Sequence, residues 1–411
     1  MIKNYFKIAI AVLKRRKFFT FISLFGISFT LTILLVATAL FENVMSPSYP
    51  DYNRENSLYI DRVTIENSKA GWINSSSASF NFIKSYVTTL KTPYKIAFFT
   101  FGRTTNAYVN NKKIGVEYKF TNDTYWEVTK YDFVEGKPYG EKQVENADYV
   151  AVITERTKNE YFGNVPSVVG KYIEIDNVNY RVTGVVKDVP RTNRNFDADM
   201  YIPYTASKTD YRDQGLMGGY GAVLVAKSKA DFPLIRKEYL NVLKKVPLED
   251  GFDRLYAHAD TTWEHFSRQI FGNNETVGFG RMAGVVGLLL LLFLSLPTIN
   301  LVNINITRIM ERSSEIGVRK AFGASSKTLV YQFLIENVIL TLIGGVLGVI
   351  LSQITLYLFN QSAFIPDLHL TLNFTVLTVG LFLCLIFGLL SGVYPAWRMS
   401  RLNVVAALKA N

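Results

Sequence analysis

The sequence has very little cysteine and histidine, the two residue types on which many metal and redox sites depend. Its 411 residues contain one cysteine, Cys384, and three histidines. A lone cysteine can form neither an intrachain disulfide nor a CxxC pair. His258 and His265 do not have the spacing of a metal-binding pair, and no HExxH motif accompanies them. We therefore predict no catalytic residues, no metal site and no cofactor bound by this chain.

Positive charge is in excess, but three short segments carry it. The formal net charge is +11. Residues 1–17, the segment 308–327 and the tail from Arg398 together hold fourteen basic and two acidic side chains, so the remainder is close to neutral. Each segment adjoins a long apolar run. This placement indicates the orientation of a membrane protein and argues against a nucleic-acid partner.

Four apolar runs are long enough to cross a bilayer, which takes about 20 helical residues. They predict transmembrane helices over 18–41, 281–304, 329–359 and 372–397. The first run could also be a secretory signal, since Ala37-Thr38-Ala39 resembles a cleavage site. Its length favours an uncleaved anchor, because signal cores span only about 7–15 apolar residues.

Basic residues favour the cytoplasmic side of a membrane, which orients the four helices. The amphipathic N-terminus 1–17, the segment 305–328 and the tail 398–411 are then cytoplasmic, whereas 42–280 and the short loop 360–371 lie outside. The predicted fold class is an α-helical membrane protein with four transmembrane helices. A large mixed α+β extracytoplasmic domain lies between the first and second helix. The expected location is the inner (cytoplasmic) membrane.

Glycines recur at four-residue spacing in the last two runs, at Gly344 and Gly348 and at Gly388 and Gly392. Such spacing lets helix backbones approach closely. It fits packing within one bundle and also a seam between two copies.

Alternating apolar residues predict mixed secondary structure in 42–280. Strands are expected around Leu58–Ile60 and Val63–Ile65, a helix over 77–90, and a hairpin pairing 172–175 with 180–186 across Asp176-Asn177. A strand at 222–226, a helix over 231–243 and a strand near 255–258 predict a βαβ-like unit.

The segment after the second apolar run combines both signs of charge at helical spacing. Glu315 and Arg319 form an i,i+4 pair in the favourable order. This predicts a short amphipathic helix at the inner surface, which could rest on lipid headgroups or dock into a protein groove. The residues concerned are Arg308, Glu311, Arg312, Glu315, Ile316, Arg319 and Lys320.

Several motifs together resemble the MacB/FtsX-type permease family of ABC transporters. In the cytoplasmic segment and the run after it, they are Arg312–Ala324 and Gln332–Glu336. At the end of the fourth apolar run they are Gly392–Arg398 and Ala406–Leu408, and around the first run they are Arg16-Lys17 and Leu24–Ile27. In the large domain they are Glu135–Pro138, Val169–Lys171 and Val182–Val186. The resemblance covers most of the chain, and the cytoplasmic motif is its most specific part.

This resemblance implies a homodimeric or heterodimeric permease driven by a separate ABC ATPase subunit that binds the ATP. No GxxxxGK[ST] loop occurs in the 411 residues. The seven residues named above, which lie between Arg308 and Lys320, would couple the permease to the ATPase. A periplasmic adaptor or envelope partner could join the complex. The substrate could be a peptide, an antimicrobial, a toxin or a lipoprotein. An FtsX-like regulator of an envelope enzyme and a sensor of antimicrobial peptides are the alternatives.

Overall fold

The computed structural model describes residues 17–109, 112–191, 195–208, 215–311, 325–362 and 370–400, with single residues 11, 15, 193, 211, 318 and 322. Contacts divide the chain into two compact units. One is a mixed α/β domain over Val44–Met282, and the other comprises the described parts of Met1–Asn43, Ala283–Phe364 and Leu368–Asn411.

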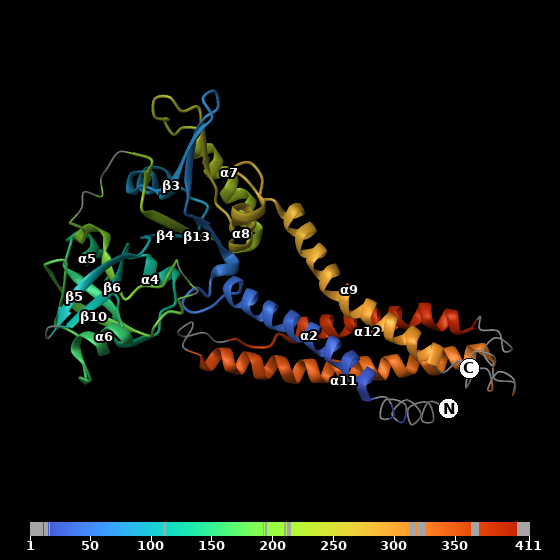
Figure 1. Ribbon diagram of the computed structural model, residues 1–411. Helices are drawn as coiled ribbons and strands as arrows, with labels where there is room; N and C mark the ends of the chain where they lie inside the picture. Colours follow the sequence, from blue (N-terminus) through green and yellow to red (C-terminus); the bar gives the residue numbers. More distant parts are fainter. Residues whose placement is uncertain are drawn as a thin grey trace. The chain divides into compact units, whose positions relative to one another are not determined.

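Four long helices account for most of the second unit (Figure 1). They are α2 (Lys17–Met45), α9 (Phe279–Glu311), α11 (Ser326–Gln361) and α12 (Phe374–Ser400). Each of the four apolar runs falls largely within one of them. Among the described residues, α2 and the Leu334–Gln361 part of α11 are long and apolar enough to cross a membrane. The apolar stretches found in α9 and α12, Phe279–Phe293 and Phe374–Leu383, are shorter.

Glycines allow α2 and α11 to approach closely. A Cβ added at Gly344 would lie 2.8 Å from Ile27, and one added at Gly348 would lie 3.0 Å from Leu31. Ile27 and Leu31 are both buried. Thr32 Oγ1 also donates to the Gly348 carbonyl across 3.2 Å. The glycine face of α11 is therefore covered by α2 of the same chain. Gly388 and Gly392 belong to α12.

The mixed domain is built on a 14-stranded, largely antiparallel sheet. The main path runs β14-β2-β3-β13-β4-β6-β11-β8-β10-β7; β1 pairs with β13, β12 with β3, β5 with β6 and β9 with β10. Only β6 with β11 and β8 with β10 run parallel among the described strands. The strands are β1 (Ser57–Ile60), β2 (Val63–Asn67), β3 (Trp72–Ala78), β4 (Lys95–Thr100), β5 (Arg103–Val109), β6 (Lys112–Thr121), β7 (Phe133–Gly136), β8 (Val150–Thr154), β9 (Tyr172–Ile175), β10 (Val178–Val186), β11 (Met200–Pro203), β12 (Met217–Gly218), β13 (Tyr220–Val225) and β14 (Arg254–Ala257).

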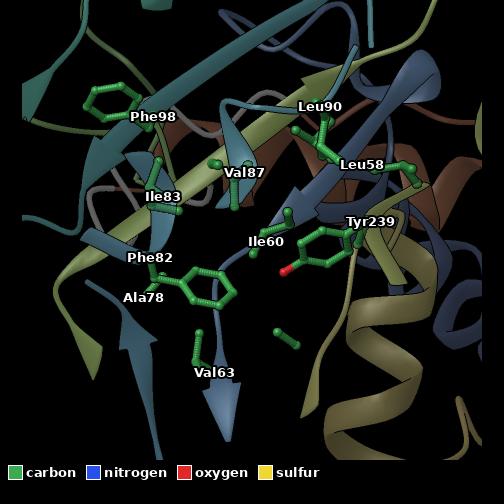
Figure 2. Close-up of a cluster of buried hydrophobic side chains, with 14 of the residues drawn as sticks. Leu58, Ile60, Val63, Ala78, Phe82, Ile83, Val87, Leu90, Phe98 and Tyr239 are labelled. Carbon is green, nitrogen blue, oxygen red and sulfur yellow. The ribbon is translucent and has the colours of Figure 1, made fainter. Parts of the chain in front are cut away.

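Short helices pack on this sheet. They are α3 (Phe80–Phe82), α4 (Tyr125–Val128), α5 (Glu141–Glu145), α6 (Glu155–Phe162), α7 (Phe232–Leu243) and α8 (Thr262–Phe271). One apolar core joins β1 and β2 to α7 and the helical turns after β3 (Figure 2). Ile60, Phe82 and Tyr239 are each at most 1% exposed within it. At about 25 cal/mol per Å² of buried apolar surface, such clusters supply the main stabilisation of the domain.

The structure confirms several of the predicted elements. The break between Ile60 and Val63 separates β1 from β2. The predicted hairpin is β9–β10, and its turn residues Asp176 and Asn177 both have positive φ, 50° and 57°. Such values suit a type I′ turn, in which Asn and Asp are favoured.

One prediction for this domain is wrong in its bounds, and another is wrong altogether. The helix expected over 77–90 begins only at Phe80, because residues 77 and 78 continue β3 and the Ser79 side chain caps the first turn at the amide of Phe82. The βαβ-like unit is also absent from the described sheet. Its elements exist as β13, α7 and β14, but β2 and β3 lie between the two strands, and each neighbouring pair along that path is antiparallel.

Candidate functional site

The residues predicted to couple to an ATPase fall at the end of α9 and beyond it. Arg308 and Glu311 belong to the last turn of α9. Arg312, Glu315, Ile316, Arg319 and Lys320 lie outside the described residues. Their coupling role stays a prediction.

The described residues contain no group of three or more potential metal ligands. The two histidines of the mixed domain have separate partners instead. His258 Nε2 lies 2.7 Å from the carbonyl oxygen of Asn274, and burial lowers the pKa of His258. His265 Nδ1 lies 3.2 Å from Asp61.

A buried arginine of the mixed domain, Arg54, caps the C-terminal end of α2, where Val44 is the first residue of that domain. The Arg54 guanidinium donates to the carbonyls of Val44 (2.7 Å) and Ser46 (2.8 Å). It also donates to Asp51 Oδ2 (2.8 Å) and to Asn193 Oδ1 (3.1 Å). Only 8% of Arg54 is exposed. The last carbonyls of a helix lack partners within the helix, so Arg54 provides donors for the end of α2.

Asp51 extends this arrangement to strand β1. Its Oδ2 accepts a hydrogen bond from Tyr59 Oη (2.7 Å) as well as from Arg54. Asp51 and Tyr59 are both buried. Burial raises the pKa of Tyr59 far above its ordinary value, so the phenol stays protonated and donates. Burial also raises the pKa of Asp51, while its two donors act against this.

Tyr59 then links β1 to the segment that leads into α9. Its amide donates to the Asp260 carbonyl (2.8 Å), and the Asp260 amide donates back to Tyr59 (3.1 Å). The Asp260 carboxylate accepts from Arg268 on α8, from Nε at 2.7 Å and from Nη2 at 3.1 Å. Bidentate arginine–carboxylate pairs hold both groups in a fixed orientation. Arg54, Asp51, Tyr59, Asp260 and Arg268 thus form one chain of contacts, here called the closure network.

The connection from α8 to α9 is tight. Ser267 Oγ donates to the Val277 carbonyl (2.9 Å), and Arg268 Nη1 donates to the carbonyl of Asn273 (3.2 Å). Gly278 has φ +81°, and a Cβ there would collide with the backbone of Phe271. These contacts connect the residues just before α9 to α8, and Arg268 belongs to the closure network as well.

Sequence reasoning missed this network, and one signal could have found its helical part. Thr261 and Glu264 form a capping box at the start of α8, and its T-x-x-E spacing is visible in the sequence. Arg54 gave no such signal, because its contacts with Val44 and Ser46 are to backbone carbonyls and Asn193 is distant in the sequence.

The glycine-containing motifs of the large domain lie at one junction of strands. Gly136, which ends β7, has φ +64°, and a Cβ there would collide with the Thr183 carbonyl. Glu135 accepts hydrogen bonds from Lys158, from Ser167 Oγ (2.8 Å) and from the Val168 amide (3.0 Å). These motifs have a structural role in the fold.

Comparison with known proteins agrees with this architecture. The family described as MacB-like periplasmic core domain matches residues 20–239, and the FtsX-like permease C-terminal family matches residues 287–404. A pyoverdine export ATP-binding/permease protein PvdT of Pseudomonas syringae pv. syringae (strain B728a) is 28% identical over 290 residues, 70% of this chain and 42% of its own length. A macrolide export ATP-binding/permease protein MacB of Salmonella typhi is 27% identical over 364 residues, 87% and 50% respectively.

Among solved structures, the periplasmic region of MacB from Actinobacillus actinomycetemcomitans is 18% identical, with a TM-score of 0.38 over 51% of this chain and 92% of that one. The chain belongs to the MacB/FtsX-type permease family of ABC transporters. It spans about half the length of the curated relatives that it matches.

Proposed function

We propose that this chain is a four-helix permease subunit that transmits ATP-driven motion to its large extracytoplasmic domain. In this proposal α2, α9, α11 and α12 cross the cytoplasmic membrane, and the segment from Arg308 to Lys320 contacts an ABC ATPase on a separate subunit. Two permease chains, alike or different, would act together. The mixed domain would export or extract a substrate on the outer side, and a periplasmic adaptor or other envelope partner could attach to it.

The closure network is the observation that carries this proposal. It connects the carbonyl end of α2 with the segment before α9 through charged side-chain hydrogen bonds and one backbone pair, Tyr59 with Asp260. Buried networks of this kind are stiff, because breaking one member leaves a charge without compensation. A displacement of α2 relative to α9 would thus change the domain as a whole. In the proposal, such a displacement would be driven by the ATPase with which permeases of this family work.

Charge reversal in the cytoplasmic segment tests the coupling. The double variant Glu315→Lys with Arg319→Glu should lose the ATPase subunit during purification in mild detergent, while insertion into the membrane is unchanged. The matched control is Lys142→Glu with Glu145→Lys, which reverses two exposed charges on α5. If the cytoplasmic variant retains and stimulates the ATPase like the wild type, the assignment of the coupling segment is wrong.

Purification of the wild-type chain from its host distinguishes the roles open to such a permease. A stoichiometric ATPase with vanadate-sensitive ATP hydrolysis is the expected result. A co-purifying cell-wall hydrolase would identify a mechanical regulator, and a signalling kinase would identify a sensor. Recovery of the intact chain without an ATPase would contradict the proposal.

A further inference from the structure

A polar cleft of about 790 Å³ opens in the mixed domain. Its walls come from the β1–β2 connection, β3, the residues after β4, β6, the segment between β10 and β11, and α8. Small-molecule sites usually have volumes of about 300–1,000 Å³. The cleft therefore has the size of a site for a small solute, and the charges on its walls indicate which kind.

Two carboxylates and one guanidinium form the acidic end of the cleft. Arg191 Nη1 lies 3.6 Å from Glu117 Oε2 and 3.6 Å from Asp197 Oδ2, beyond hydrogen-bonding distance. Asp197 is only 5% exposed, and its Oδ1 accepts no hydrogen bond within the described part of the chain. Burial raises the pKa of Asp197. A buried carboxylate oxygen without a donor is costly, so a positively charged donor that reaches Asp197 would be stabilised.

The backbone holds Glu117 at this end. The Glu117 amide donates to Asp199 Oδ2 (2.9 Å), and the Asp199 amide donates to the Glu117 carbonyl (2.7 Å). The carboxylate of Glu117 lies against Gly102, where a Cβ would collide with Oε1. Gly102 therefore leaves room for this carboxylate at the wall of the cleft.

A positive charge without a partner lies elsewhere on the wall. Arg62 is exposed, and no ion pair or hydrogen bond engages its guanidinium among the described residues. The neighbouring carboxylate of Asp61 is already occupied by His265. Neutral hydrogen-bonding groups, including Ser76 and Gln269, complete the walls. Within the described residues, the cleft thus presents a carboxylate with one unpartnered oxygen and a guanidinium without an ion pair.

We propose that this cleft binds a zwitterionic solute of the size of a di- or tripeptide. Its ammonium group is held by Asp197 and Glu117, and its carboxylate is held by Arg62. Complementary charges at two ends fix the orientation of such a ligand, and the neutral walls accept its amide groups.

The site also adjoins both ends of the closure network. Asn193, which accepts from Arg54, lies in the same segment as Arg191 and Asp197, and its carbonyl accepts from the Asp197 amide (2.9 Å). His265 and Gln269 belong to α8. An effect of ligand binding on α2 and α9 rests on the proposed function, whereas ligand binding in the cleft does not. A direct binding measurement therefore tests the cleft separately from the proposed function.

Three small peptides test the site on the full-length chain in detergent micelles. Ala-Ala-Ala carries both charges, N-acetyl-Ala-Ala-Ala lacks the ammonium group, and Ala-Ala-Ala-amide lacks the carboxylate. Calorimetric titration should give saturable binding of Ala-Ala-Ala with a dissociation constant below about 1 mM. Each capped peptide should bind at least about tenfold more weakly.

Variants then assign each end of the ligand. In Asp197→Asn, Ala-Ala-Ala should bind about tenfold more weakly, and acetylation should cause no further loss, because both changes remove the same contact. In Arg62→Gln, Ala-Ala-Ala should also bind about tenfold more weakly, and amidation of the peptide should cause no further loss of affinity, because both changes remove the contact with the carboxylate. Glu145→Gln removes an exposed charge on α5 and should bind like the wild type. Unchanged melting temperatures establish that the variants are folded.

Three results overturn the proposal. The first is the absence of saturable binding of Ala-Ala-Ala up to about 10 mM, which is far weaker than a specific site requires. The second is equal binding of the charged and capped peptides. The third is unchanged affinity in folded Asp197→Asn. A normal ATPase interaction together with any of these results would leave the proposed function intact.

Discussion

The Arg54 guanidinium lies 2.7 Å from the carbonyl oxygen of Val44, the next-to-last residue of α2. The same guanidinium is paired with Asp51, so one side chain satisfies both a helix end and a buried carboxylate. This double role makes the residue sensitive to substitution in a way that an exposed ion pair is not.

Arg54→Ala should destabilise the folded chain by about 3–5 kcal/mol, because it leaves the buried Asp51 carboxylate without its cation. The comparison is Lys229→Ala, which breaks an exposed pair with Glu55 and should cost at most about 1 kcal/mol. Thermal unfolding of both variants in the same detergent measures the difference. Equal melting temperatures for the two variants would mean that Arg54 does not hold the end of α2.

Glu135→Gln should destabilise the domain at neutral pH by about 2 kcal/mol, because it weakens charged hydrogen bonds. Burial raises the pKa of Glu135, but hydrogen bonds from Lys158, Val168 and Ser167 outweigh it, and the pKa is lowered overall. A lowered pKa contributes stability that is present above about pH 4.5 and is lost as the pH falls through the folded-state pKa.

The gap in melting temperature between wild type and Glu135→Gln should therefore narrow on acidification. Glu145→Gln, at an exposed position on α5, should show little difference at any pH. A gap of constant size down to about pH 3 would contradict the assigned role of the Glu135 charge.

Gly136→Ala should cost at least about 2 kcal/mol more than Gly163→Ala. Both glycines have positive φ, +64° and +72°. A Cβ at Gly136 collides with a backbone carbonyl, which cannot move aside as a flexible side chain can, whereas Gly163 faces open space. Denaturant unfolding of the two variants compares them directly, and equal stability would rule out close packing of β7 on β10.

Gly344→Val should lower the melting temperature of the full-length chain, because overpacking a helix contact costs about 1–3 kcal/mol. Gly287→Val is the control, since nothing lies within 4 Å of a Cβ there. Size-exclusion chromatography with light scattering gives the oligomeric state of each variant. A changed oligomeric state with an unchanged melting temperature would assign Gly344 to a seam between two copies.

Local features of this fold could be predicted from the sequence, and long-range ones could not. The β9–β10 hairpin was predictable because Asp176-Asn177 specifies its turn within two residues. The helix near residue 77 was misplaced because Ser77 and Ala78 carry no signal that separates a strand end from a helix start.

The pairing of β14 with β2 depends on contacts between segments far apart in the chain, so spacing along the sequence indicated a different unit. The residues of the polar cleft likewise could not be grouped from the sequence. Arg62, Glu117 and Asp197 belong to separate segments that only the folded sheet brings together.

The paired backbone of Tyr59 and Asp260 has a consequence for how this architecture can vary. The bridge pairs β1, near the start of the mixed domain, with the residues before α8, near its end, and domains whose ends lie close together tolerate insertion into a host. The domain can therefore be regarded as a cassette inserted between two helices. Relatives could exchange or enlarge it while the spacing of its attachment points is preserved, which would let one helical scaffold serve different tasks.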